Sequence, residues 1–327
     1  MDNQSHILLT GGTGFFGKTL LRHWVNQEQL GIRVPSVTLI SRDPERFSRQ
    51  HSLLVMHPWL QMVKADICDF GSLPRHISFT HVLHAAADST VGPTLSHQER
   101  FDQIVSGTRN MLDLAVACGA TKFLLTSSGG AYGPQPAEMK TIPENYNGMP
   151  DPLVPSNTYS VAKRQAEHLC ALYGKLNSIE TVIARCFAFV GEDLPKDAHF
   201  AIGNFIRDAQ ERSEITVNGN GSPLRSYMYQ SDLAHWLLTL LQFGKAGNAY
   251  NVGSDEVISI VDAAHLVRDI LAPEKKVHIK GAPLADNADR NRYVPDISKA
   301  KLELGLEVTI PLAQAIKLSA ITSSALK

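Results

Sequence analysis

The stretch HILLTGGTGFFGKTLL, residues 6–21, decides the fold. It joins an apolar run of strand length to a helical pattern through a loop in which Gly11, Gly14 and Gly17 are three residues apart. Glycine allows a tight turn here and lets a diphosphate approach the backbone, where its charge faces a helix N-terminus. The strand–loop–helix context therefore predicts a dinucleotide-binding turn, with a plain glycine turn as the alternative.

Apolar runs continue to alternate with helical segments through the first two thirds of the chain. This alternation is typical of βαβ units, so we expect an α/β fold: a Rossmann doubly wound parallel sheet with a smaller C-terminal α+β substrate domain. Gly119 is expected to end the second helix. The predicted strands are 6–10, 36–41, 61–66, 81–86, 122–128, 181–185 and 248–252, and the predicted helices include 17–27, 100–119 and one near 200–212.

The change of pattern after Arg185 divides the chain into two expected domains. The dinucleotide-binding domain should comprise residues 1–186 plus about 227–255. The substrate domain should comprise about 187–226 plus 256–327.

Composition excludes several classes of protein. The chain has 327 residues and a formal net charge of −1, which argues against a nucleic-acid or anionic-membrane partner. The N-terminus has no signal-peptide pattern and no apolar run approaches the ~20 residues of a membrane span. The four cysteines show no paired spacing and favour a reducing compartment, so we expect a cytoplasmic protein. We expect no metal site, because His81 and His84 would point to opposite faces of a strand.

The end of the second strand bears on the choice of dinucleotide. Ser41 and Arg42 stand where a carboxylate would select NAD, and a hydroxyl and a guanidinium suit the 2′-phosphate of NADP. We therefore expect NADP, with NAD possible if Asp43 is the selecting acid. Asp43 followed by Pro44 also fits a helix N-cap, which is the interpretation we prefer.

Other strand ends supply further candidate contacts. Asp66 and Ile67 can bracket an adenine, and residues Ala85, Ala86 and Ala87 leave room for the cofactor to cross the sheet edge. The full predicted set of cofactor contacts is Gly11, Thr13, Gly14, Phe15, Phe16, Gly17, Ser41, Arg42, Asp66, Ile67, Ala85, Ala86, Ala87, Thr126, Tyr159 and Lys163.

Tyr159 and Lys163 lie one helical turn apart and hence on one face of a helix. A neighbouring ammonium, helped by a positively charged nicotinamide ring, lowers the pKa of a tyrosine. The pair then forms a general acid/base for a sugar hydroxyl or carbonyl. Ser128, at the end of the fifth strand, can hydrogen-bond the same substrate oxygen. A surface Tyr–Lys pair is the alternative.

The chain resembles the extended short-chain dehydrogenase/reductases, the NAD(P)-dependent group of nucleotide-sugar epimerases, dehydratases and reductases. The resemblance spans nearly the full length. It implies Ser128, Tyr159 and Lys163 as catalytic residues, and substrate contacts from Ser128, Tyr159, Asn204, Arg225 and Arg292. It also implies a nucleotide-diphosphate sugar as substrate and a homodimer through helices near 100–118 and 159–172. The motifs that carry it are TGGTGFFG (10–17), TSSGGAYG (126–133), YSVAKRQAEHL (159–169), GNGSPLRSYMYQSDLA (219–234), AYNVGSDEVISI (249–260) and RNRYVPDISKAKLELG (290–305).

Two motifs depart from the family pattern. The helix motif NVxGT appears as IVSGT (104–108), and RxxNVYG appears as RCFAFVG (185–191) with Ala188 in place of asparagine. One substrate or cofactor contact made by each asparagine is therefore missing from the expected set.

Gly129 and Gly130 stand where 4,6-dehydratases of this family carry Asp-Glu. Elimination of water needs an acid and a base, and glycine provides neither, so dehydration is not the expected reaction. We expect NADPH-dependent reduction of a nucleotide-linked 4-keto-6-deoxyhexose, with dTDP as the expected nucleotide. A nucleotide-sugar 4-epimerase is the alternative, and a non-catalytic cofactor-binding scaffold is a further one. Loops around 88–99, 134–156 and 187–203 should set sugar and stereochemistry.

Overall fold

The computed structural model describes residues 5–87, 95–196, 200–281 and 291–321. At its centre lies a parallel sheet of seven strands in the order β11-β6-β5-β4-β1-β2-β3. This order confirms the doubly wound Rossmann sheet. The direction in which successive strands are added to the sheet reverses between β1 and β4. The strands are β1 (His6–Thr10), β2 (Ser36–Ser41), β3 (Leu60–Lys64), β4 (His81–His84), β5 (Lys122–Ser128), β6 (Glu180–Cys186) and β11 (Ala249–Val252).

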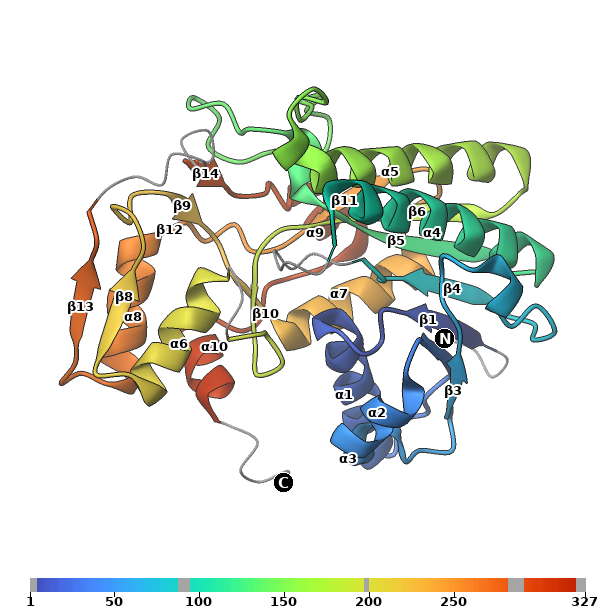
Figure 1. Ribbon diagram of the computed structural model, residues 1–327, viewed down its shortest axis with the longest axis horizontal. Coiled ribbons are helices and arrows are strands. Elements are labelled where there is room, and N and C mark those ends of the chain that lie inside the picture. The colour runs from blue at the N-terminus through green and yellow to red at the C-terminus, as the bar shows by residue number, and fades with distance from the viewer. Residues whose placement is uncertain (1–4, 88–94, 197–199, 282–290, 322–327) are drawn as a thin grey trace.

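Helices cover both faces of this sheet (Figure 1). One face carries α1 (Phe15–Gln29), α2 (Pro44–Gln50), α3 (Ser52–Val55) and α7 (Gln230–Phe243), and the other carries α4 (His97–Ala117) and α5 (Thr158–Leu176). Successive strand residues alternate between the two cores, as the pleat requires. Ile7 and Leu9 pack on the side of α1 and α7, and Leu8 packs on the side of α4 and α5.

Two strands end earlier than predicted, because hydrogen bonds from side chains form turns where the backbone pairing of the sheet was expected to continue. β3 stops at Lys64, since the Asp66 carboxylate accepts a hydrogen bond of 2.9 Å from the backbone N–H of Cys68. β4 stops at His84, since the backbone N–H of Ala86 bonds the Thr10 hydroxyl at 3.1 Å. Gly119, with a φ of +75°, follows the C-cap of α4 as expected.

The smaller unit, at the left of Figure 1, has its own core between helices and short sheets. Ile297, Ala300 and Leu306 nevertheless pack into the core of the large sheet, so the chain returns to it near its C-terminal end. The short sheets are β10–β7, β12–β9–β14 and β13–β8. The elements are β7 (Phe189–Val190), α6 (Ala201–Glu211), β8 (Glu214–Val217), β9 (Leu224–Arg225), β10 (Met228–Tyr229), β12 (Ile258–Ser259), α8 (Ile260–Leu271), β13 (Lys276–Ile279), β14 (Arg292–Tyr293), α9 (Ser298–Leu304) and α10 (Leu312–Ala320).

The described residues also form three 3-10 turns: η1 (Phe70–Ser72), η2 (Gly129–Tyr132) and η3 (Pro155–Asn157). Within the described ranges, no helix combines the length and apolar character that crossing a bilayer requires.

Candidate active site

The glycine loop packs tightly against the end of β4. Gly11 has a φ of +71°, and a Cβ built on it would lie 2.6 Å from the carbonyl carbon of Ala85. A Cβ on Gly17 would lie 2.1 Å from the Cα of Gly12. Both positions therefore require glycine, for backbone conformation in the first case and for close packing in both.

Gly14 differs, because its outer side is open. It is exposed, and a Cβ there would meet only the carbonyl oxygen of Gly11, at 3.4 Å. Gly14 is also the N-cap of α1, and no side chain of the described residues caps this helix. Uncapped N–H groups beside an open glycine fit a dinucleotide diphosphate.

The other predicted loop residues divide into two kinds. Thr13 is exposed at the tip of the loop. The rings of Phe15 and Phe16 instead pack against Phe189 of β7, with ring centroids 6.3 Å and 5.4 Å from it. These two phenylalanines can offer a dinucleotide their backbone. Both side chains pack against the core of the large sheet, and that of Phe15 also packs against the core of the smaller unit.

A buried polar chain that the sequence did not reveal lies under the loop. Thr10 Oγ1 is 2.7 Å from Nδ1 of His84, and Nε2 of His84 is 3.2 Å from Oγ1 of Thr108 on α4. Burial lowers the pKa of His84 to about 3, so its ring is neutral at physiological pH. This chain ties β1, β4 and α4 together directly below the glycine loop.

The end of β2 matches the preferred interpretation of its sequence. The Asp43 carboxylate accepts a hydrogen bond of 3.0 Å from the backbone N–H of Arg46, which confirms Asp43 as the N-cap of α2. The backbone N–H of Asp43 in turn bonds the hydroxyl of Ser41 at 3.2 Å. Ser41 is the last residue of β2 and Arg42 is exposed next to it.

The end of β3 is held against α4. Asn110 donates a hydrogen bond of 2.8 Å from its side chain to the carbonyl of Ile67. A Cβ on Gly107 would lie 2.7 Å from the Cδ1 of Ile67, so this glycine allows the close approach. Asp66 uses one carboxylate oxygen in its turn, as described above.

Ser128, Tyr159 and Lys163 come together where β5 meets the first turn of α5. The Ser128 hydroxyl lies beside the Tyr159 hydroxyl and lowers the pKa of Tyr159, and Ser128 Oγ accepts a hydrogen bond of 3.0 Å from the backbone N–H of Gly130. Lys163 Nζ lies 5.8 Å from the centroid of the Tyr159 ring and donates a hydrogen bond of 2.7 Å to the carbonyl of Thr126. The Thr126 hydroxyl bonds the carbonyl of His84 at 3.3 Å, which links this group to the glycine loop.

The protonation of this group differs from the sequence-based expectation. Burial is the largest cause that raises the pKa of Tyr159 above its ordinary value, and the phenol of Tyr293 raises it further. Burial also lowers the pKa of Lys163 to about 8. Desolvation thus outweighs the acidifying effect expected of the ammonium and favours the protonated form of Tyr159.

A second buried network lies behind the three residues. Glu167, one turn after Lys163, accepts a hydrogen bond of 2.5 Å from Ser127 and pairs with Arg185 of β6 at 2.7 Å. The Arg185 guanidinium stacks 4.5 Å from the ring centroid of Tyr132. The Tyr132 hydroxyl donates to Asn251 Oδ1 of β11 at 2.8 Å. Sequence reasoning missed this network, since its members are far apart in the chain.

Gly129 and Gly130 are enclosed by other side chains. A Cβ on Gly129 would lie 2.7 Å from the Cζ of Phe187 and 2.7 Å from the hydroxyl of Tyr293. A Cβ on Gly130 would lie 2.6 Å from the hydroxyl of Ser160. The surroundings of these glycines thus leave no room for an acidic pair.

The predicted substrate residues come from the smaller unit. Arg225 and Arg292 lie on the paired strands β9 and β14, where Arg225 is opposite Tyr293 and Arg292 is opposite Leu224. Because neighbouring positions on a strand face opposite sides, Arg225 and Arg292 lie on opposite faces of this small sheet. Asn204 is half-buried on α6. Of the loops expected to set specificity, residues 88–94 and 197–199 lie outside the described residues.

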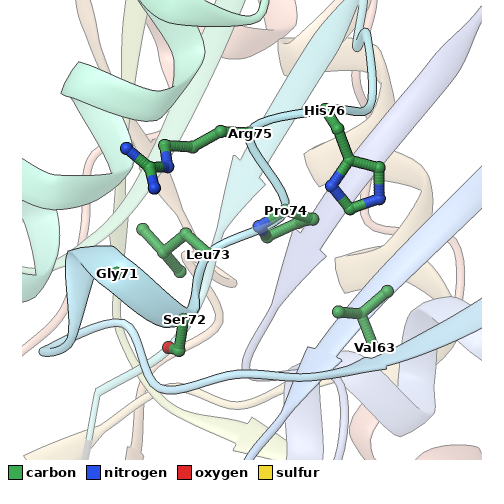
Figure 2. A pocket seen from close by; sticks show the side chains of 7 residues that line it. All are labelled: Val63, Gly71, Ser72, Leu73, Pro74, Arg75 and His76. Carbon is green, nitrogen blue, oxygen red and sulfur yellow. The ribbon is translucent and has the colours of Figure 1, made fainter.

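Figure 2 shows a surface pocket of about 540 Å³ lined by Val63 and residues 71–76. None of the predicted site residues lines it, so we assign it no part in the chemistry. Among the residues with described positions, no group of three or more His, Cys, Asp or Glu side chains could hold a metal ion.

Comparison with known sequences shows the family to which the chain is similar. A family model described as NAD dependent epimerase/dehydratase family matches residues 7–253. UDP-glucuronic acid decarboxylase 1 of Danio rerio is 30% identical over 315 residues, covering 96% of this chain and 71% of that protein. UDP-glucuronic acid decarboxylase 6 of Arabidopsis thaliana is 29% identical, covering 97% and 88%.

Solved structures share the fold. The UDP-glucose 4-epimerase of Thermotoga maritima with UDP-glucose superposes with a TM-score of 0.82 at 21% identity, covering 98% of this chain and 100% of that one. The UDP-glucuronic acid 4-epimerase of Bacillus cereus, in complex with UDP-glucuronic acid and NAD, gives 0.81 at 23% identity with coverage of 98% and 100%.

Proposed function

The chain belongs to the NAD-dependent epimerase/dehydratase family, and from that premise we propose that it reduces a nucleotide-linked 4-keto-6-deoxyhexose with NADPH, with dTDP as the expected nucleotide. One observation carries this choice: Phe187, Tyr293 and Ser160 enclose Gly129 and Gly130. No carboxylate can then stand beside Tyr159 from these positions. The site is suited to proton and hydride transfer at one sugar carbon, and Gly129 and Gly130 supply neither the acid nor the base that elimination of water needs.

In this proposal Ser128 and Tyr159 hold the carbonyl oxygen of the substrate. A reduced nicotinamide, when held by the glycine loop, would supply the hydride for the new C–H bond. The Tyr159 hydroxyl gives its proton to the oxygen, which becomes the alcohol, and Tyr159 recovers a proton from solvent. Lys163, anchored on the Thr126 carbonyl, keeps its ammonium beside the ring and stabilises the negative charge that Tyr159 develops.

A protonated Tyr159 is the form that a reduction needs in its first step. Burial raises the pKa of Tyr159, so the residue begins as a proton donor. A reduced nicotinamide ring carries no positive charge and would leave that state unchanged. An enzyme that begins by oxidising its sugar needs the phenolate instead.

The preference for NADP rests on the end of β2. The Asp43 carboxylate is used to cap α2, which leaves the Ser41 hydroxyl and the Arg42 guanidinium near the expected ribose position. A guanidinium and a hydroxyl can both donate to a 2′-phosphate. The glycine loop, Asp66, Ile67 and residues 85–87 would hold the rest of the dinucleotide.

The second candidate is a nucleotide-sugar 4-epimerase. Epimerisation at C4 needs Ser128, Tyr159 and Lys163 and no further acid, and the solved epimerases named above share this fold. An epimerase keeps its cofactor and shows no net oxidation, whereas a reductase uses one reduced cofactor for each turnover.

The test follows directly from that difference. NADPH and dTDP-4-keto-6-deoxyglucose are mixed with the protein, and cofactor oxidation is followed by absorbance and compared with sugar alcohol formed. We expect one NADPH oxidised for each alcohol. If no 4-keto nucleotide sugar gives stoichiometric oxidation, the epimerase replaces the reductase.

We further propose a division of labour and an assembly. Residues 1–186 plus about 227–255 would hold the dinucleotide, and about 187–226 plus 256–327 would hold the nucleotide sugar, with Asn204, Arg225 and Arg292 as contacts. A homodimer through α4 and α5 is supported by exposed apolar side chains on these helices, among them Val116, Leu172 and Leu176.

A further inference from the structure

Tyr293 reaches the three catalytic residues from the opposite unit. It lies on β14 of the smaller unit, and its hydroxyl donates a hydrogen bond of 3.3 Å to the backbone carbonyl of Cys186 at the end of β6. Its ring packs on Phe187, with centroids 4.6 Å apart. The hydroxyl also stands 2.7 Å from the place that a Cβ on Gly129 would take, directly beside Ser128.

Tyr293 and Phe187 form a wall beside Ser128, and this wall is poorly suited to an anionic group of a ligand. Because the Tyr293 proton is directed to the Cys186 carbonyl, its oxygen can act toward a ligand as an acceptor. Phe187 offers only an apolar ring.

From this geometry we propose that Tyr293 is a specificity-determining residue, which with Phe187 accepts a methyl or hydroxyl substituent on the ring carbon next to the reacting carbon and disfavours a carboxylate there. The inference rests on the proposed function, since it places the reacting carbon between Ser128 and Tyr159. A neighbouring ring carbon and its substituent must then lie along the wall. A carboxylate at that position would lose its hydration against an aromatic ring and an acceptor oxygen.

The distinction matters because the relatives compared above are named for a uronic acid. A neutral substituent at this position separates a 6-deoxy or 6-hydroxy hexose from a hexuronic acid. On the basis of Tyr293 we therefore expect a sugar without a carboxylate, which the names of those relatives do not predict.

The experiment compares two sugars that differ only at this position. The full chain, saturated with NADPH so that neither sugar is oxidised, is titrated by calorimetry with UDP-glucose and UDP-glucuronic acid, and with the two corresponding dTDP-linked sugars. We expect the hexose to bind at least about tenfold more tightly than the uronic acid of the same nucleotide, since burial of an unpaired charge is costly. Equal or tighter binding of the uronic acid overturns the inference and leaves the nucleotide-sugar function standing.

Variants then assign the effect to one oxygen atom. Tyr293→Phe keeps the ring and should reduce the ratio of the two dissociation constants by about threefold, mainly through tighter uronic acid binding. The matched variant Tyr173→Phe removes a hydroxyl near the C-terminal end of α5 that donates to Asp113 of α4, and it should leave the ratio unchanged. An unchanged ratio in Tyr293→Phe refutes the role of Tyr293. If no sugar of either nucleotide binds the wild type, the proposed function fails and this inference with it.

Discussion

Glu167 accepts a hydrogen bond of 2.5 Å from the hydroxyl of Ser127, the residue immediately before Ser128. Glu167 lies on α5, on the helix that carries Tyr159 and Lys163, and its carboxylate is also paired with Arg185. One carboxylate therefore connects the strand end that carries the serine to the helix that carries the tyrosine. We regard Glu167 as a positioning residue for the two proposed catalytic hydroxyls.

Glu167→Gln should lower kcat by about tenfold or more, because a small displacement of Ser128 relative to Tyr159 weakens proton transfer. The KM for NADPH should change less than kcat, since Glu167 bonds Ser127 and Arg185 rather than the glycine loop. Glu180→Gln is the control, because Glu180 pairs with Lys122 on a half-exposed surface of the same sheet. Equal kcat values for the two variants, whatever their thermal stability, would contradict the positioning role.

Lys163 gives the reaction a pH dependence. Its pKa of about 8 means that the ammonium is present below that pH and is lost above it. The kcat/KM for NADPH, which reports groups of the free enzyme, should be level between pH 6 and 7 and fall as pH rises through about 8. Lys163→Arg keeps a charge at all these pH values and should remove the fall even if the rate is lower. A persistent fall in the arginine variant would assign it to another group.

Tyr159→Phe removes the proposed proton donor and leaves the ring. We expect a loss of kcat of about a hundredfold or more with nucleotide-sugar affinity retained, as general acid catalysis contributes on this scale. Steady-state kinetics measures the loss of kcat, and calorimetry measures the affinity for the nucleotide sugar. Full activity in this variant would mean that the chemistry takes place elsewhere or through another donor.

Ser41→Asp places a carboxylate at the end of β2, where it would repel a 2′-phosphate. The KM for NADPH should rise by about tenfold or more and that for NADH should change little. Ser36→Asp is the same substitution at the exposed start of the same strand and serves as the control. If Ser41→Asp leaves the KM for NADPH and the KM for NADH unchanged, the argument for NADP fails.

Gly129→Ala tests the enclosed glycine. The added methyl group would meet Phe187 and Tyr293, so we expect a loss of about 1–3 kcal/mol in the free energy of unfolding, as for other overpacked sites. Phe187→Leu in the same chain should recover part of this loss, because it removes the ring atoms that the methyl group contacts. A double-mutant cycle from urea unfolding measures the coupling. Additive free energies would show that the two positions do not interact.

The sequence alone determined the features that depend on near neighbours. The spacing of Gly11, Gly14 and Gly17 predicted the turn, Asp43 before Pro44 predicted the N-cap, and the four-residue step from Tyr159 to Lys163 predicted a shared helix face. Turn, cap and periodicity are set within one or two helical turns of chain, so a short window of sequence contains them.

Only the tertiary structure decided what faces those features. Tyr293 meets Gly129, Arg185 meets Glu167 and His84 meets Thr10 because parallel strand register and the return of the chain from the smaller unit bring their backbones together. No local pattern encodes such distances. For the same reason the raised pKa of Tyr159 was not foreseen: its ammonium neighbour is visible in the sequence, but the burial that outweighs it comes from packing of the whole chain.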